Sequence, residues 1–225
     1  DGRAQADFLV QEGIVDASAV DVLADGSISG VDVERFSPDR DGRAALRRML
    51  AIPEDAVVVL FLGRVNRDKG VPELVSAAAS VAAGDERLHL VIAGPDEESL
   101  DEELRRSAEP LGERYHRQGY VSDPERWFAA SDVFALPSHR EGFGTSVLEA
   151  AACGIPAVVS DIYGLRDAVV PDQTALRVPV GDRQALAAAL RALTSDDERR
   201  LAMGDAALRR ARERFGRDRL VASYR

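Results

Sequence analysis

Short apolar runs alternate along the chain with longer segments in which apolar residues recur every three or four positions. Positions 57–62 form a continuous run rich in Val, which is typical of a strand buried on both faces of a sheet. Further runs at 88–93, 133–136 and 157–160 predict strands of the same kind, and 114–118 predicts a weaker one. The pattern therefore predicts a parallel sheet.

The segments between these runs predict helices. The first helix follows Gly70, and its apolar stripe at the spacing i, i+3, i+4 and i+7 consists of Val71, Leu74, Val75, Ala78, Ala79 and Ala82. An acidic helix is expected over 97–109. Asp123 followed by Pro124 indicates the cap and the first residue of another helix.

Three more helices are expected in the C-terminal half. One begins near Thr145, and one is capped by Asp182 and runs through Leu193. In the last, Ser195 and Glu198 have the spacing of a capping box. Its apolar residues at helical spacing are Leu201, Leu208, Ala211 and Phe215.

Alternating strands and helices predict a doubly wound α/β fold, with a Rossmann-like parallel sheet covered on both faces. We assign this domain to residues 41–225. Residues 1–40 fit the pattern less well and are expected to be an interdomain remnant or linker, in which 20–24 could form a strand and 29–38 a linker. The chain does not begin with Met and reads as a fragment of something longer.

Charge and composition narrow the possible partners. The 225 residues include 29 Lys and Arg against 39 Asp and Glu, a formal net charge of −10. Nucleic-acid binders need a broad basic face, so no nucleic-acid partner is expected. The single cysteine, Cys153, excludes an internal disulfide and fits a reducing compartment. An anionic ligand would have to meet a local concentration of cations.

Targeting and membrane signals are weak. No apolar run reaches the ~18 residues of a membrane-spanning helix, and the first residues lack the layout of a signal peptide. We expect a cytoplasmic location, with peripheral attachment to the inner face of the membrane left open. The arginine-rich last helix is equally consistent with a surface helix packed on the core.

The loop after the first strand is a candidate anion site. It carries three cations, Arg64, Arg67 and Lys69, between Gly63 and Gly70. Ligands of parallel sheets bind at the carboxyl ends of strands, and Arg and Lys suit phosphate. The alternative is a charged loop exposed to solvent.

The loop at 138–145 is the second candidate. Gly142 and Gly144 permit a close backbone approach, and the helix beginning there offers free amides to an anion or a sugar hydroxyl. Glu141 precedes this helix and Glu149 lies within it. Carboxylates bind sugar or ribose diols, although a glutamate at such a position is commonly solvated.

Other reactive residues have simpler interpretations. His139 could be a general base or merely an exposed loop residue, His89 reads as a core histidine and His116 as a surface residue. Cys153, among small residues, reads as a core filler. No metal-ligand spacing, nucleophile elbow, Walker loop or dinucleotide fingerprint is present in the sequence.

These motifs together resemble those of a known family. Gly63-Arg64 with Lys69-Gly70, then Glu141-Gly142-Phe143-Gly144 with Glu149 and the run 152–156, are similar to the C-terminal donor-binding domain of the retaining group 1 glycosyltransferases of the two-Rossmann (GT-B) architecture. The resemblance covers nearly all of residues 28–215. Ser29 departs from it, standing where an asparagine is common.

The resemblance implies a role for each matching residue. Arg64 and Lys69 would hold the donor diphosphate and stabilise the leaving group, while Glu141 would face the donor sugar, these three being the expected catalytic residues. Glu149 would bind the ribose. The remaining residues expected along the donor site are Gly63, Gly94, Pro95, Gly119, Tyr120, Val121, Gly142, Phe143, Gly144 and Thr145. The donor would be a UDP or GDP sugar, with no metal and no other cofactor.

The sequence departs from the resemblance in carrying only one complete Rossmann domain. The acceptor, a saccharide or a lipid-linked molecule, would be held by a missing N-terminal domain. We therefore expect the chain to bind nucleotide but to transfer sugar slowly or not at all. An epimerase or phosphorylase of the same architecture and a non-catalytic α/β interaction module remain alternatives. A glycoside hydrolase is disfavoured because the cationic loop has no role in hydrolysis.

Overall fold

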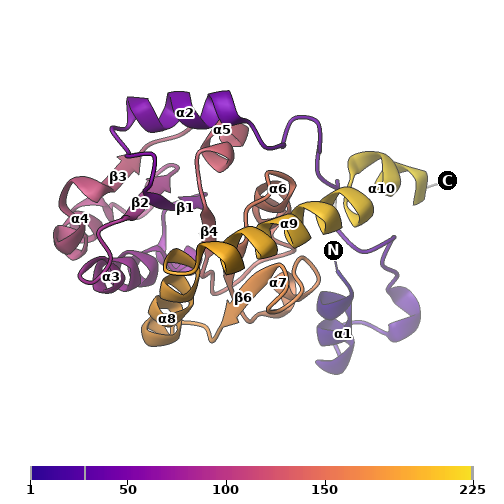
Figure 1. Cartoon of the computed structure of the whole chain (residues 1–225). Helices are drawn as coiled ribbons and strands as arrows, with labels where there is room; N and C mark the ends of the chain where they lie inside the picture. Colours follow the sequence, from indigo (N-terminus) through magenta and orange to yellow (C-terminus); the bar gives the residue numbers. More distant parts are fainter. Residues whose placement is uncertain (1, 28, 224–225) are drawn as a thin grey trace.

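The computed structural model describes residues 2–27 and 29–223 and centres on a parallel sheet of six strands (Figure 1). The strand order is β3-β2-β1-β4-β5-β6, and every pairing between neighbours is parallel. The strands are β1 (Val57–Leu62), β2 (Leu88–Ala93), β3 (Tyr115–Gln118), β4 (Val133–Leu136), β5 (Ala157–Ser160) and β6 (Ala175–Val178). The predicted doubly wound α/β fold is confirmed.

Helices cover both faces of the sheet. They are α1 (Arg3–Gln11), α2 (Arg40–Met49), α3 (Val71–Ala82), α4 (Asp101–Ser107), α5 (Pro124–Ala129), α6 (Thr145–Ala152), α7 (Tyr163–Arg166), α8 (Arg183–Thr194), α9 (Asp197–Arg214) and α10 (Arg217–Ser223). Short 3₁₀ turns add η1 (Ala17–Ala19), η2 (Arg67–Lys69) and η3 (Glu109–Arg114). Helix α3 packs on α8, whereas α2 packs on α5 and α6 packs on α9.

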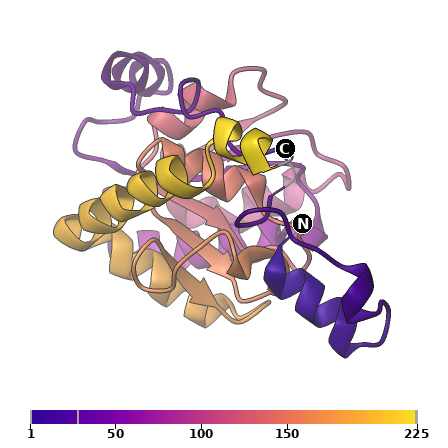
Figure 2. The same cartoon turned by 90° about the vertical axis from the view of Figure 1, so that its right-hand side faces the viewer.

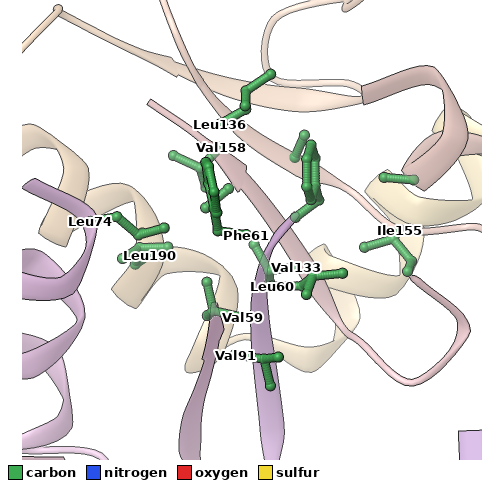
Figure 3. Packing of buried hydrophobic residues seen from close by; sticks show 14 of the residues in the cluster. Val59, Leu60, Phe61, Leu74, Val91, Val133, Leu136, Ile155, Val158 and Leu190 are labelled. Atoms are coloured by element: carbon green, nitrogen blue, oxygen red, sulfur yellow. The ribbon is translucent and has the colours of Figure 1, made fainter. Parts of the chain in front are cut away.

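The core lies between the sheet and these helices. Val59, Leu60 and Phe61 of β1 are fully buried because β1 is central and covered on both sides. Figure 3 shows them with Leu74 of α3 and Leu190 of α8. The continuous apolar runs of the sequence are therefore the inner strands of the sheet.

Several sequence predictions of local structure are confirmed. The four strong strands have the predicted bounds, and the weak strand is β3. Asp182 caps α8 by accepting the amides of Gln184 and Ala185. Strand β6 was not predicted, because Arg177 breaks the apolar run where the edge of the sheet meets solvent.

Other local predictions are wrong. Residues 20–24 form no strand, and the segment before them contains α1 and η1. The last long helix is capped by Asp196, which accepts the amide of Arg199, whereas the hydroxyl of Ser195 donates to the carbonyl of Arg191 in α8. The acidic helix begins only at Asp101, since Ser99 adopts a left-handed conformation with φ 57°.

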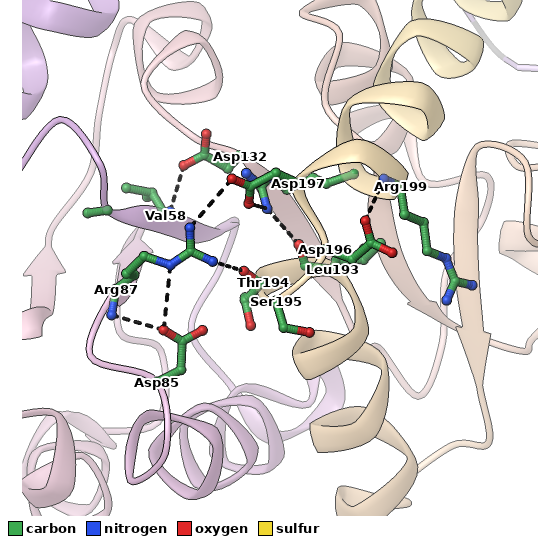
Figure 4. A network of polar contacts seen from close by, with 12 residues as sticks. Val58, Asp85, Arg87, Asp132, Leu193, Thr194, Ser195, Asp196, Asp197 and Arg199 are labelled. Atoms are coloured by element: carbon green, nitrogen blue, oxygen red, sulfur yellow. Dashed lines mark hydrogen bonds and ion pairs between the residues drawn. The ribbon is translucent and has the colours of Figure 1, made fainter.

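Ion pairs join the amino ends of the strands to the surrounding helices. Arg87, just before β2, donates to the carbonyl of Thr194 at 2.8 Å and lies 3.5 Å from Asp197 (Figure 4). Asp132, just before β4, accepts the amide of Val58 at 2.7 Å. These contacts fix the corner between α8 and α9 to the sheet.

The N-terminal segment projects from the body of the molecule (Figure 2). Helix α1 rests on α7, where the ring of Phe8 stacks on that of Tyr163 with centroids 4.5 Å apart. Residues 31–38 instead follow the body, and Val31 pairs with Gly216. The division of the chain at residue 40 stays a prediction. Within the described residues, no helix has the length and apolarity needed to span a bilayer.

Candidate functional site

The loops predicted to carry the chemistry leave the sheet at its topological switch point. Strands β1 and β4 are neighbours, and the chain proceeds from them in opposite directions, through β2 and β3 on one side and β5 and β6 on the other. In open α/β sheets the crevice beyond the carboxyl ends of such a strand pair is the ligand site. Loops 63–70 and 137–145 follow these two strands, and the region between the two loops is here called the crevice.

The two loops are locked together by their backbones. The amide of His139 donates to the carbonyl of Asp68 at 2.7 Å, and Arg140 pairs with the carboxylate of Asp68. Gly70 has φ +68°, and a Cβ there would lie 2.2 Å from the carbonyl oxygen of Pro137. Only glycine permits this approach, so the positions of Lys69 and Glu141 are set by one rigid unit.

Lys69 and Glu141 meet in this crevice. The Nζ of Lys69 lies 2.6 Å from Oε1 of Glu141, and the hydroxyl of Ser138 donates to the same oxygen at 2.9 Å. The two charged side chains are only 17% and 13% exposed. The structure thus brings together two of the three predicted catalytic residues in a partly desolvated pair.

Arg64 lies on the same loop but faces an acidic neighbour. Its Nη1 is 3.4 Å from the carboxylate of Glu97, and its side chain is 62% exposed. Asn66 donates to the same carboxylate at 2.8 Å. Arg67 turns further away, to Glu103 of α4, at 2.6 Å. Arg64 is therefore an exposed residue with a single, long ionic contact, on the same loop as Lys69.

The acidic partners of this loop were missed by the sequence analysis. Glu97 and Glu103 follow β2, and they reach the loop after β1 because the two strands run side by side in register. The backbones meet closely where the strands end. Gly94 has φ +137°, and a Cβ on it would lie 1.8 Å from the carbonyl oxygen of Gly63. Gly94, one of the predicted site glycines, thus has a structural role.

The start of α6 forms the other wall. Gly144 has φ +72° and is buried, whereas its neighbours Gly142 and Thr145 are exposed residues at the amino end of the helix, where free amides suit an anion or a hydroxyl group. The side chain of Phe143 is different. It is 4% exposed and its ring lies 5.9 Å from that of Phe215, so it belongs to the core.

Glu149 is not the solvated residue that its place in a helix suggested. Its side chain is largely buried, and burial raises the pKa of its carboxyl group to about 7. Arg35 acts in the opposite sense, more weakly. Cys153, one turn later, is a buried thiol whose pKa is raised to about 12, mainly by burial, which agrees with a core filler.

The segment 119–121 borders the crevice beside Gly94. The amide of Gly94 donates to the carbonyl of Gly119 at 3.0 Å. Tyr120 is 80% exposed, whereas Val121 packs against the core. This leaves the aromatic ring of Tyr120 available at the rim.

The histidines divide into a buried pair and a loop residue. His89 is buried as predicted, but His116 is half-buried and not a surface residue, because its ring stacks on His89 with Nε2 3.0 Å from Nδ1 of that residue. His139 is partly exposed, 4.0 Å from Glu73. Within residues 2–27 and 29–223, no three His, Cys, Asp or Glu side chains are grouped to hold a metal ion.

The sequence is similar to a known protein family and to curated proteins. The family model described as "Glycosyl transferases group 1" matches residues 42–210. A D-inositol 3-phosphate glycosyltransferase of Xylanimonas cellulosilytica is 37% identical over 204 residues, which cover 86% of this chain and 48% of the relative. The chain spans about half the length of the curated relatives that it matches.

Solved structures share the fold. Sucrose-phosphate synthase from Thermosynechococcus elongatus superposes with a TM-score of 0.81 at 29% identity, covering 99% of this chain and 55% of the other. HepE from Anabaena, solved in complex with UDP, has a TM-score of 0.88 at 22% identity, over 99% of this chain and 60% of the other. At the latter identity the likeness concerns the fold alone.

Proposed function

Because the chain belongs to the group 1 glycosyl transferases, we propose that it is the donor-binding part of a glycosyltransferase and binds a nucleoside-diphosphate sugar between the loops that follow β1 and β4. The observation that carries this proposal is the Lys69–Glu141 contact of 2.6 Å at the switch point, with Arg64 on the same loop. Lys69 and Glu141 thus bring a cation and a carboxylate together at the ligand edge of the sheet, and the exposed Arg64 of the same loop is proposed to join them on the diphosphate.

The chemistry assigns complementary roles to these groups. When the bond between the anomeric carbon and the diphosphate breaks, negative charge grows on the leaving group and positive charge on the sugar ring. Lys69 and Arg64 stabilise the first, and the carboxylate of Glu141 orients the sugar and stabilises the second. These cations supply the charge that a divalent ion would otherwise provide, so we propose metal-independent transfer.

The other residues around the two loops are suited to the sugar, the ribose and the base of the donor. Backbone amides at 142–145 donate to sugar hydroxyls and phosphate oxygens. Glu149 accepts the ribose hydroxyls, and Tyr120 and Val121 border the base. HepE was solved with UDP and with UDP-glucose, which makes a uridine diphosphate sugar the first donor to test.

We further propose that a separate domain holds the acceptor. Support comes from the length of the relatives, of which this chain spans about half, and several of them are named D-inositol 3-phosphate glycosyltransferases. Transfer would then occur in a cleft between the two domains, with retention of anomeric configuration. The isolated chain would bind the donor but transfer it slowly.

Calorimetry with UDP, GDP and ADP tests the donor site. Lys69→Ala and Arg64→Ala are each expected to weaken the preferred nucleotide about tenfold, the usual value of a lost charge-assisted hydrogen bond. Arg67→Ala is the matched control, since this cation of the same loop is turned toward Glu103, and its effect should stay below about twofold. Wild-type affinity in the Lys69 and Arg64 variants would refute the site, and absence of any nucleotide binding would favour a non-catalytic module.

A further inference from the structure

A second group of cations lies at the opposite edge of the sheet, where the strands begin. Helix α2 carries Arg40, Arg43, Arg47 and Arg48. Arg43 lies three residues after Arg40, Arg47 four residues after Arg43, and Arg48 eight residues after Arg40, which places the four side chains along one side of the helix. Asp132, which precedes β4, anchors two of them, with Arg43 at 2.6 Å and Arg47 at 2.5 Å.

The anchored arginines are held by several hydrogen bonds. Arg47 is 4% exposed and donates to the carbonyls of Ala130 at 3.0 Å and Ala56 at 3.1 Å. Arg43 donates to the carbonyl of Ser131 at 2.9 Å. The carboxylate of Asp132 also accepts the amide of Val58, so its oxygens are fully engaged (Figure 4). This carboxylate therefore does not neutralise further cations.

The other two arginines have no such partner. Arg40 and Arg48 are exposed, and neither side chain has a hydrogen-bonding or ionic partner in the part of the chain that the structure describes. Burial lowers the pKa of Arg47, the charge of Asp132 opposes this shift, and the charge of Arg43 adds to it more weakly. The four arginines of α2 outnumber the nearby carboxylates of Asp39, Asp41 and Asp132, in a chain of net charge −10.

A hollow opens beside these four side chains. Its volume is about 250 Å³, and its wall contains the four arginines with Ala44, Ile52 and Glu54. A second hollow of about 280 Å³ shares Arg40 and Arg43 with the first. Glu54 is the one carboxylate on the wall of the first hollow. The volume lies at or below the lower end for small-molecule sites, which suits a compact ligand.

We propose that the hollow beside α2 binds a small phosphomonoester or inorganic phosphate, with Arg40 and Arg48 closing on the phosphoryl oxygens from either side of Arg43. Guanidinium groups present paired donors that match phosphate oxygens. Arg43 is oriented by Asp132 in advance, which reduces the entropy lost on binding. The site is independent of the proposed donor function, because its residues precede the strands instead of following them.

An NMR titration of the ¹⁵N-labelled chain with sodium phosphate tests this proposal, with sodium chloride at matched ionic strength as the reference. Saturable shifts are expected at the amides of residues 40–48. Glycerol 3-phosphate should reproduce them, and glycerol should not. The amides of Lys69 and Gly144 report phosphate at the donor loops in the same spectra, so the two sites succeed or fail separately.

The double variant Arg40→Gln/Arg48→Gln should weaken the phosphate affinity measured at the amides of residues 40–48 at least fivefold. Its matched control is Arg105→Gln/Arg106→Gln, two adjacent exposed arginines of α4, which should leave the response unchanged. Shifts that grow linearly, match those of sodium chloride or survive the double variant would overturn the proposal. If the double variant unfolds, the wild-type titration decides alone, because absence of saturation there refutes the site.

Discussion

The ammonium group of Lys69 lies 2.6 Å from the carboxylate of Glu141, and both side chains are mostly shielded from water. A diphosphate entering the crevice must therefore share Lys69 with an internal anion. Glu141 should therefore weaken the binding of a nucleoside diphosphate even though its carboxylate assists sugar transfer.

Glu141→Gln should tighten the binding of a nucleoside diphosphate severalfold while lowering sugar transfer by the full-length enzyme. The variant removes the negative charge beside Lys69 and so leaves its ammonium group free for phosphate oxygens. Calorimetry and a transfer assay measure the two effects. Glu103→Gln, which frees Arg67 outside the crevice, should change neither. Weaker nucleotide binding in Glu141→Gln would contradict the competition.

Glu149→Gln should stabilise the protein at pH 8 but weaken nucleotide binding. The folded-state pKa of Glu149 is raised to about 7 from an ordinary 4.5, so the folded state retains a proton that the unfolded state releases. Stability from this residue is therefore lost as pH rises from about 4.5 to 7. The variant should gain up to about 3 kcal/mol at pH 8 and almost nothing at pH 4.5.

Denaturant unfolding at the two pH values measures this gain. Glu102→Gln is the control, because Glu102 is exposed on α4 and should show no pH-dependent difference. An equal gain in the free energy of unfolding at both pH values would show that the difference between glutamine and glutamate at position 149 arises from packing and not from ionisation.

Acid should destabilise the fold through the His89–His116 pair. Burial, and then the nearby His116, lower the pKa of His89 to about 4. Between pH 6.5 and 4, His89 binds a proton in the unfolded chain but not in the folded one. The free energy of unfolding is therefore highest above pH 6.5 and falls as the pH decreases. The loss from His89 amounts to about 3 kcal/mol at pH 4.

Melting temperatures across this pH range should fall less steeply in His89→Gln than in wild type. His139→Gln serves as the control because His139 is partly exposed in a loop. An unchanged slope in His89→Gln would assign acid sensitivity to other groups.

Gly94→Ala should destabilise the protein by at least about 3 kcal/mol. Its Cβ would overlap the carbonyl oxygen of Gly63 at 1.8 Å, and its φ of +137° is strained for any other residue. Gly119→Ala is the matched control at the end of the neighbouring strand β3, since nothing lies within 4 Å of a Cβ placed there. Equal stabilities of the two variants in denaturant would contradict the close approach.

The strands and the two site loops were predictable because local patterns determine them. Val-rich runs mark buried strands, and glycines with cations directly after a strand mark a loop at the ligand edge of the sheet. Lys69 and Glu141 were both predicted at the ligand edge, but the ion pair between them was not, because it requires that their strands, β1 and β4, be neighbours in the sheet. The likeness to the group 1 glycosyltransferases rested on these same positions and is confirmed.

Features that depend on distant contacts were not predictable. Helix α2 was not predicted because its four arginines obscure the apolar pattern in the sequence. Arg47 is buried through distant partners that include Asp132, which lies 85 residues later. The burial of Glu149 likewise depends on elements packed around α6 and not on its own helix. Glu97 became a partner of Arg64 only through the register of β1 with β2.

The contact of α1 with α7 has a structural consequence. Phe8 stacks on Tyr163, and the next residue, Gly164, is so close to Glu141 that a Cβ on it would lie 1.9 Å from the Glu141 carbonyl oxygen. The N-terminal segment is thereby linked, through Tyr163 and Gly164, to the residue whose carboxylate pairs with the ammonium group of Lys69.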